Sequence, residues 1–300
     1  MAVFKACPFT FEDNTPLFSH VLHPRFSQMV LDEALLKIRT PHRLFVQSES
    51  LLLKEEISVQ ASLDIGDYIQ RSFFLFGFPE FTFHLLRFCD RHTCFFDIGA
   101  NAGLISCGVS RCVSHDHIHA FEPVPSNLEM LRTNFSKNCP AAHAYEFALS
   151  DKIGGFEMVV LSHDSGSASL ETQYRTKRTK DIGIPCQIDS INVRLLTFDA
   201  FIVQNSLQFA GLSKAAFKID VEGHEMPVLR GMDGFLRKHG TQLEVLIVVE
   251  AHRQNFDEVQ LFLKGHGFKQ IWPDERTVTS FLARKVGAID LIFHRYPQSD

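Results

Sequence analysis

The chain has 300 residues, and its 45% hydrophobic content is enough for one sizeable core with a small appendage. The formal net charge is -5 and Arg175–Lys180 is the one dense basic run, which argues against a nucleic-acid binder. Seven cysteines without a Cys-x-x-Cys spacing argue against a disulfide framework, and no apolar run of about 18 residues or signal peptide is apparent. We therefore expect a cytoplasmic protein without a membrane span.

Residues 1–90 are expected to form a helical and irregular N-terminal extension to a main domain over residues 91–300. Apolar spacing predicts helices over Phe26–Ile38 and Leu51–Ile69 in this extension. The aromatic-rich segment Ser72–Cys89 is expected to lie against the core. Because the extension carries no recognisable motif, we treat it as a candidate for shaping the substrate site.

From Thr93 onward, short apolar runs alternate with helical patterns, which is typical of a parallel sheet with crossover helices. This order predicts an α/β fold built on a Rossmann-like, doubly wound sheet of about seven strands. The predicted strands are Thr93–Asp97, Ile118–Phe121, Tyr145–Leu149, Gly155–Leu161, Asn192–Thr197, Ala215–Asp220, Leu243–Glu250, Phe268–Trp272 and Ala288–His294. The predicted helices are Ala102–Val113, Ser126–Asn138 with Ser126 as its N-cap, Glu225–Leu236 and Asp257–Gly265.

A polar insert, Ser162–Asp189, separates the fourth and fifth of these strands, which we expect to pair like a hairpin beside the sheet. Within the insert, Ser165–Leu170 has the composition of a flexible stretch, either closing over the site or remaining an exposed loop. His163 in the insert and His252, after the strand Leu243–Glu250, are candidate substrate contacts.

A glycine-rich turn, Asp97–Gly103, follows the first strand of the main domain. Ligands of open α/β sheets bind at the carboxyl ends of the strands, and Gly99 and Gly103 permit a tight turn there. A dinucleotide site requires Gly-x-Gly-x-x-Gly, but Asn101 and Leu104 occupy the second and third glycine positions. The turn therefore argues against a pyrophosphate-binding fingerprint.

Two acidic residues next to this turn indicate which cofactor binds. Asp97 ends the first strand, where a carboxylate repels a phosphate and suits the cationic amino and sulfonium groups of S-adenosylmethionine. Glu122 ends the second strand about 20 residues later, at the separation from which an acid accepts the hydroxyls of a ribose. Because NAD also carries that ribose, Asp97 is the residue that favours S-adenosylmethionine.

Asp220, Glu222 and His224 follow the strand Ala215–Asp220 and are the candidate catalytic residues. Methyl transfer requires the acceptor to be aligned with the methyl group and often deprotonated. One hypothesis is that Asp220 positions or deprotonates an acceptor hydroxyl, with Glu222 or His224 assisting. The alternative is that Asp220 contacts the cofactor amino group and Glu222 caps the next helix.

We do not expect a required metal ion. Asp220 and Glu222 offer carboxylate oxygens, but no third ligand is evident at the following strand beyond Glu250. The run His115–His119 has alternating histidines, but it enters the second strand from the end opposite the ligand crevice. We therefore expect that run to be a surface loop rather than a zinc site.

Together these motifs resemble the FkbM family of methyltransferases, over about residues 90–275. The resemblance implies a class I methyltransferase sheet of seven strands with an antiparallel last strand. It also implies S-adenosylmethionine as cofactor and a sugar or other small hydroxylated molecule as acceptor. The segments that carry it are Phe96–Gly103, Ala120–Pro123, Ala148–Asp151, Leu196–Asp199 and, most specific to the family, Lys218–Glu225 with the following Leu229–Gly231.

The resemblance also implies roles for residues around the cofactor. Its methionine part would be held by Asp97, Gly99, Asn101 and Gly103, its ribose by Glu122, and its adenine by Ala148 and Leu149. Ala100, Pro123 and Asp220 complete the expected cofactor-binding set.

Two other classes of function stay open on the sequence. One is an NAD or nucleotide-sugar enzyme on the same fold, against which the missing glycines count. The other is a non-catalytic binding module, against which the acids retained at the strand ends count. For the methyltransferase, we expect a small-molecule partner and no nucleic acid.

Overall fold

The computed structural model describes residues 42–50, 55–64, 67–161, 164–169, 188–239, 242–283 and 287–297. The helix predicted over Phe26–Ile38, the candidate contact His163 and the basic run Arg175–Lys180 lie outside these residues. The five cysteines within the described ranges are free, and Cys7 and Cys186 lie outside these ranges.

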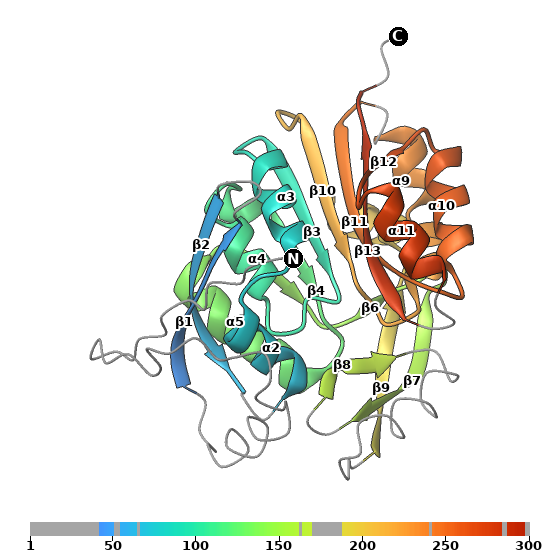
Figure 1. The fold of residues 1–300 in the computed structure, drawn as a ribbon. Coiled ribbons are helices and arrows are strands. Elements are labelled where there is room, and N and C mark those ends of the chain that lie inside the picture. Colours follow the sequence, from blue (N-terminus) through green and yellow to red (C-terminus); the bar gives the residue numbers. More distant parts are fainter. Residues whose placement is uncertain are drawn as a thin grey trace.

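A seven-stranded sheet forms the centre of the fold, with the order β12-β13-β11-β10-β3-β4-β5 (Figure 1). Strand β13 runs antiparallel to both of its neighbours, and the other neighbouring pairs are parallel. The doubly wound α/β fold with an antiparallel last strand is thereby confirmed. The strands are β3 (Thr93–Ile98), β4 (Ile118–Phe121), β5 (His143–Tyr145), β10 (Lys214–Ile219), β11 (Glu244–His252), β12 (Lys269–Trp272) and β13 (Ala288–Arg295).

Side chains of the central strands alternate between two apolar clusters, one on each face of the sheet. Phe95 and Ala216 belong to one cluster, and the next residues along the chain, Phe96 and Phe217, belong to the other. Burial on both faces explains why these strands are almost continuously apolar. The first face packs against α3 (Glu80–Phe88), α4 (Leu104–Val109) and α5 (Pro125–Asn138), and the second against α7 (Phe198–Gln204), α8 (Glu225–Gly231), α9 (Asp233–Lys238), α10 (Phe256–Gly265) and α11 (Glu275–Leu282).

A smaller, four-stranded sheet follows the order β6-β9-β7-β8. It consists of β6 (Ala148–Leu149), β7 (Gly154–Leu161), β8 (Asp164–Ser169) and β9 (Ile188–Leu196). Antiparallel pairing of β7 with β9 confirms the expected hairpin-like excursion. The stretch predicted as flexible instead forms strand β8, because its backbone pairs with β7.

The segment before the main sheet contains a β-hairpin, so the helix predicted over Leu51–Ile69 is wrong. Strand β1 (His42–Ser50) pairs antiparallel with β2 (Glu55–Leu63). Along β2 every second residue is buried, namely Ile57, Val59, Ala61 and Leu63, which is the periodicity of a strand. A helix, α2 (Tyr68–Phe76), begins only after Asp67, whose carboxylate accepts the backbone N–H of Gln70.

Helix α5 closes the free edge of β2 with two asparagine side chains one turn apart. The Asn134 amide accepts from the Ser62 N–H at 2.6 Å and donates to the Ser62 carbonyl at 3.1 Å. Asn138 makes the same pair of contacts with the backbone of Gln60, at 3.3 and 2.9 Å. The two amides therefore satisfy backbone groups that a neighbouring strand would otherwise pair. As a result, the hairpin and the seven-stranded sheet share the first apolar cluster.

Four further expectations differ from the structure in their boundaries. The strand predicted over Tyr145–Leu149 is divided between β5 and β6, which lie in different sheets. Helix α4 is shorter than Ala102–Val113, and α8 and α9 replace a single helix over Glu225–Leu236. Ser126 is not an N-cap, because α5 begins at Pro125, whose fixed φ suits the first helical position. Helices α7 and α11 were not predicted.

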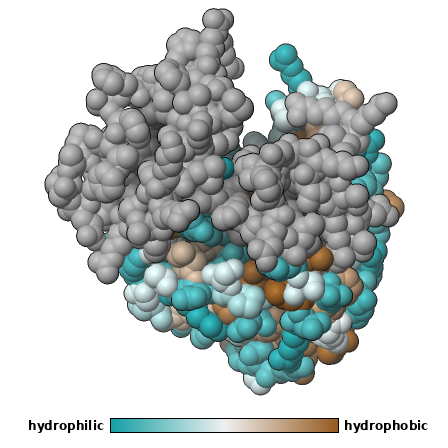
Figure 2. All heavy atoms as spheres, turned by 90° about the horizontal axis from the view of Figure 1, so that it is seen from below, coloured by the Kyte–Doolittle hydropathy of each residue, from teal (hydrophilic) through white to brown (hydrophobic). Residues whose placement is uncertain are grey.

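The face seen from below is mainly hydrophilic where residues are described, with apolar residues in small groups between polar ones (Figure 2). Among the described residues, none of the helices combines the length and apolar character needed to cross a bilayer.

Candidate functional site

The carboxyl ends of four parallel strands, β3, β4, β10 and β11, lie along one edge of the sheet. Their register pairs Ile98 with Phe121 on one side and with Ile219 on the other. Since β13 runs the opposite way, its first residues return to this edge, and Asp290 is the ladder partner of Glu250. Polar residues from five strands therefore meet at the edge where an open α/β sheet binds its ligand.

The predicted glycine-rich turn leaves β3 at this edge in left-handed backbone. Gly99 has a φ of 76°, Asn101 of 50° and Gly103 of 76°. A Cβ on Gly99 would lie 1.9 Å from the carbonyl oxygen of Asp220, and one on Gly103 would lie 3.0 Å from the Leu131 side chain. The two glycines are thus required by contacts within the protein, in addition to any approach to a ligand.

Asp97 lies beneath this turn and is completely buried. The hydroxyl of Ser106 donates to its Oδ2 at 2.7 Å, and Lys218 Nζ lies 3.5 Å from its Oδ1. Lys218 also donates to the Gly99 carbonyl at 2.6 Å and lies 3.4 Å from Asp220 Oδ2. Burial alone would lower the pKa of Lys218, but Asp220 and Asp97 raise it above its ordinary value. A charged lysine therefore joins the turn after β3 to the tip of β10.

Glu122 holds the opposite side of the same turn. Its Oε2 accepts the backbone N–H of Asn101 at 2.9 Å, and its Oε1 accepts that of Val124 at 2.9 Å. Burial raises the pKa of Glu122, although these N–H groups, Asn127 and Lys218 act in the other direction. Oε1 also accepts from the Asn127 side chain at 3.4 Å, whereas Oε2 retains a second lone pair with which it can accept a hydroxyl hydrogen.

The remaining predicted cofactor residues lie on the loops after β3 and β4 and in β6. Pro123 is half-buried, whereas Ala100 is buried. Ala148 and Leu149 are buried in β6, where they pair with Leu195 and Leu196 of β9. These last two residues therefore belong to the smaller sheet rather than to the end of the third central strand.

The structure separates the three candidate catalytic residues. Asp220 is 40% exposed at the edge, and Glu222 is partly exposed with a φ of 52°. His224 is buried, and its Nε2 lies 2.9 Å from the hydroxyl oxygen of Ser150. Asp220 and Glu222 thus remain open at the edge, while His224 connects the loop to β6.

Next to Glu222 is a second polar group, from β11 and the start of α8. Its members are Glu250, His252 and Glu225, and His252 Nε2 lies 3.1 Å from Glu250 Oε2 and 3.9 Å from Glu225 Oε1. Burial acts to lower the pKa of His252, but the adjacent Glu250 carboxylate and the charge of Glu225 raise it overall. Glu225 also accepts from the Gly223 N–H and from the Asn255 side chain, at 2.9 and 2.7 Å.

Several carboxyl groups gather at this edge, and two of them have a raised pKa. Burial, followed by the charges of Glu250 and Asp220, raises the pKa of Asp290 to about 8. Burial also raises the pKa of Glu225 to about 7. Lys218, Glu225 and Asp290 were not among the predicted site residues. Lys218 and Asp290 could have been noticed in the sequence, because each is a charged residue inside a run that was predicted as an apolar strand.

Comparisons with known proteins agree with this architecture. Residues 97–270, more than half of the chain, match the model of the methyltransferase FkbM domain. Methyltransferase 1 of Beauveria bassiana (strain ARSEF 2860) is 22% identical over 182 residues, which cover 57% of this chain and 70% of that protein.

Two solved structures match the chain at low sequence identity and low TM-score. A putative tRNA (m1A22) methyltransferase of Streptococcus pneumoniae, in complex with S-adenosyl-L-methionine, is 11% identical with a TM-score of 0.38, and the match covers 74% of each chain. A precorrin-6y C5,15-methyltransferase of Geobacter metallireducens GS-15 is 13% identical with a TM-score of 0.33, over 72% of this chain and 85% of that one. It is the family match, together with the order of the seven strands, that identifies the protein: the chain belongs to the FkbM family of methyltransferases, and S-adenosylmethionine is its methyl donor.

Proposed function

We propose that the protein transfers the methyl group of S-adenosylmethionine to a hydroxyl of a sugar or other small hydroxylated molecule. The observation that carries this proposal is Asp220, a partly exposed carboxylate at the tip of β10 among further carboxylates. Such groups accept hydrogen bonds from a neutral acceptor with several hydroxyls. The same negative charge disfavours a polyanionic acceptor such as a nucleic acid.

The residues around the turn fit this cofactor by the chemistry of their donors and acceptors. Glu122 Oε2 has a lone pair for a ribose hydroxyl, and the backbone of Gly99, Ala100, Asn101 and Gly103 lines the methionine side. We assign Pro123, Ala148 and Leu149 to the adenine side, where Ala148 and Leu149 supply apolar surface. Asp97 acts through Ser106 and Lys218, because its side chain is buried beneath the turn.

In the proposed reaction, Asp220 holds the acceptor hydroxyl and takes its proton as the oxygen attacks the methyl carbon. The new C–O bond forms while the S–CH₃ bond breaks, and the electron pair of the S–CH₃ bond returns to the sulfur. Lys218, paired with Asp220, fixes the orientation of the carboxylate. Glu222 assists from the next turn, and His224 positions that turn through Ser150.

Asp220→Asn tests this role, because the amide keeps the shape of the side chain and loses the base. We expect kcat to fall by about 10²–10⁴-fold, with the affinity for S-adenosylhomocysteine changed by no more than a few fold. Asp151→Asn is the matched control, since Asp151 is exposed to a similar degree and pairs with Arg230 outside the turn. Unchanged turnover in Asp220→Asn would exclude the base, and weaker cofactor binding with unchanged kcat would make Asp220 a cofactor ligand.

A further inference from the structure

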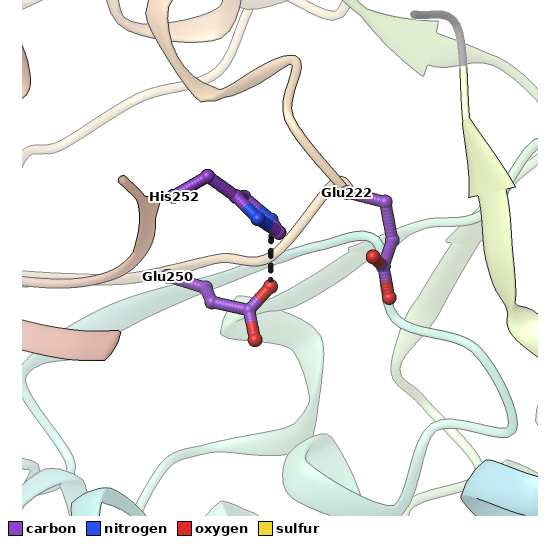
Figure 3. Close-up of side chains that lie close together, drawn as sticks. All are labelled: Glu222, Glu250 and His252. Carbon is purple, nitrogen blue, oxygen red and sulfur yellow. Dashed lines mark ion pairs between the residues drawn. The ribbon is translucent and has the colours of Figure 1, made fainter. Parts of the chain in front are cut away.

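Three side chains from two neighbouring strand ends converge at this edge of the sheet: Glu222, Glu250 and His252 (Figure 3). One carboxylate oxygen of each glutamate and one ring nitrogen of the histidine all lie within 4.8 Å of one another. Glu250 and His252 alternate on β11, so they project to the same side of that strand. Glu222 approaches from the loop after β10.

The loop that presents Glu222 is fixed by the protein around it. Glu222 adopts left-handed backbone, which is unfavourable for a residue with a Cβ. The following Gly223 donates its N–H to Glu225, which is completely buried and also bonded to Asn255. A strained residue that is held in place by buried contacts is typical of a functional site.

The environment of the cluster favours a cation. Glu250 Oε2 is buried and receives no hydrogen bond, and its ionic partner is His252 within the cluster. Asp290 is the ladder neighbour of Glu250, so a further carboxyl group lies on the adjoining strand. The nearby Lys218 is already engaged with Asp97, Asp220 and the Gly99 carbonyl.

We propose that Glu222, Glu250 and His252 bind a divalent metal ion of the Mn²⁺ class. The two carboxylates suit Mn²⁺ as they suit Mg²⁺, and the imidazole favours a transition-metal ion over Mg²⁺ or Ca²⁺, which prefer oxygen ligands alone. In an octahedral site with bonds of about 2.1 Å, ligand atoms lie about 3.0–4.2 Å apart, so a small side-chain rotation closes the observed cluster. Sequence reasoning did not expect a metal, because it lacked a third ligand beyond Glu250; the structure supplies His252.

A metal at this position has a consequence for catalysis that rests on the proposed function. Three protein ligands would leave coordination positions free, to which an acceptor hydroxyl could bind. A hydroxyl bound to a divalent cation has a lowered pKa. The cation therefore aids the transfer of the hydroxyl proton to Asp220 and orients the oxygen toward the methyl group.

Titration of the full chain with Mn²⁺ alone tests the site without any enzymatic assay. In electron paramagnetic resonance, the signal of free Mn²⁺ should decrease as the ion binds. Calorimetry should give a stoichiometry of one bound ion per chain. We expect Glu250→Gln and His252→Gln each to weaken Mn²⁺ binding tenfold or more. Glu222→Gln should weaken Mn²⁺ binding by a similar factor. Because the Glu222 side chain is partly exposed, this third variant should have the smallest effect on folding. A wild-type chain that binds no Mn²⁺ would overturn the proposal.

Glu244→Gln is the matched control, because Glu244 pairs with His294 at 2.8 Å at the other end of β11, and none of the described residues adds a third ligand there. It should bind Mn²⁺ like the wild type, and an equal loss in this variant would contradict the assignment. Methyl transfer to hydroxyl acceptors by a chain that binds no Mn²⁺ would reject the metal site alone. Mn²⁺ binding without such transfer would reject the proposed acceptor class and leave the metal site standing.

Discussion

At the scale of single residues, the turn after β3 depends on contacts that only glycine permits. Gly99 has a φ of 76° and lies directly against the Asp220 carbonyl, so its missing side chain brings the tips of β3 and β10 together. The sequence indicated the glycines correctly as marks of a tight turn. It could not show that Asp220, more than 100 positions later, is the group that requires Gly99.

Replacing Gly99 by alanine should destabilise the protein and weaken cofactor binding. Gly211→Ala is the control, because Gly211 has a φ of 83° with no atom near its missing Cβ. We expect the control to lose about 1 kcal/mol from backbone strain, and Gly99→Ala to lose more in urea unfolding because of the added clash. Equal losses in the two variants would show that the approach of Asp220 has no energetic effect.

Lys218 is a second residue whose importance appears only in three dimensions. Removing its charge in Lys218→Met leaves Asp97 buried without a cation, which should lower the free energy of unfolding by about 3–5 kcal/mol. Lys214→Met removes the lysine at the start of the same strand, where it pairs with the half-exposed Asp90. That control should cost about 1 kcal/mol or less, and a similar loss in both variants would argue against a special role for Lys218.

At the scale of elements, the docking of β2 onto α5 depends on the paired asparagines. Asn134 is completely buried and also donates to the Ala102 carbonyl at 2.9 Å, so it links the hairpin, the helix and the glycine-rich turn. This relation also explains the wrong helix prediction. The alternating burial of β2 is decided by contacts with α4 and α5, which the local sequence does not contain.

Asn134→Leu preserves the size of the side chain and removes its hydrogen bonds. Because three buried backbone groups lose their partner, we expect a loss on the order of 3 kcal/mol and faster hydrogen exchange at the Ser62 amide. Asn205→Leu is the control, since the Asn205 side chain bonds to the Phe201 carbonyl of its own helix. Unchanged exchange along β2 in Asn134→Leu would contradict this docking role.

At the scale of the whole molecule, a buried histidine makes stability depend on pH. His119 was expected in a surface loop, but it is buried in β4, stacked between Phe96 and His143, with Nδ1 3.1 Å from the Tyr145 hydroxyl. Burial, with the charges of His143 and His117, lowers its pKa to about 3. Below pH 6.5 the unfolded chain therefore takes up a proton that the folded chain does not.

This contribution is fully present above pH 6.5 and is lost as the pH falls from there toward 3. Between pH 7 and pH 5, the free energy of unfolding should therefore decrease by about 2 kcal/mol less in His119→Phe than in the wild type. Urea unfolding at both pH values measures this difference, with His92→Phe as a control at an exposed histidine. If His119→Phe keeps the wild-type pH dependence, the buried histidine is not its source.

The sequence by itself determined the alternating α/β order, the turn at Asp97–Gly103 and the acids at the strand ends. The periodicity of hydrophobic residues and the placement of glycines are local properties of the chain. Only the tertiary structure decided which of these acids face one another. Three sets of contacts join separate strands: the ion pair of the buried Asp97 with Lys218, the contact of His224 with Ser150, and the convergence of Glu222 with Glu250 and His252. Such contacts depend on sheet order and register, and these are fixed by packing over the whole domain rather than by any segment alone.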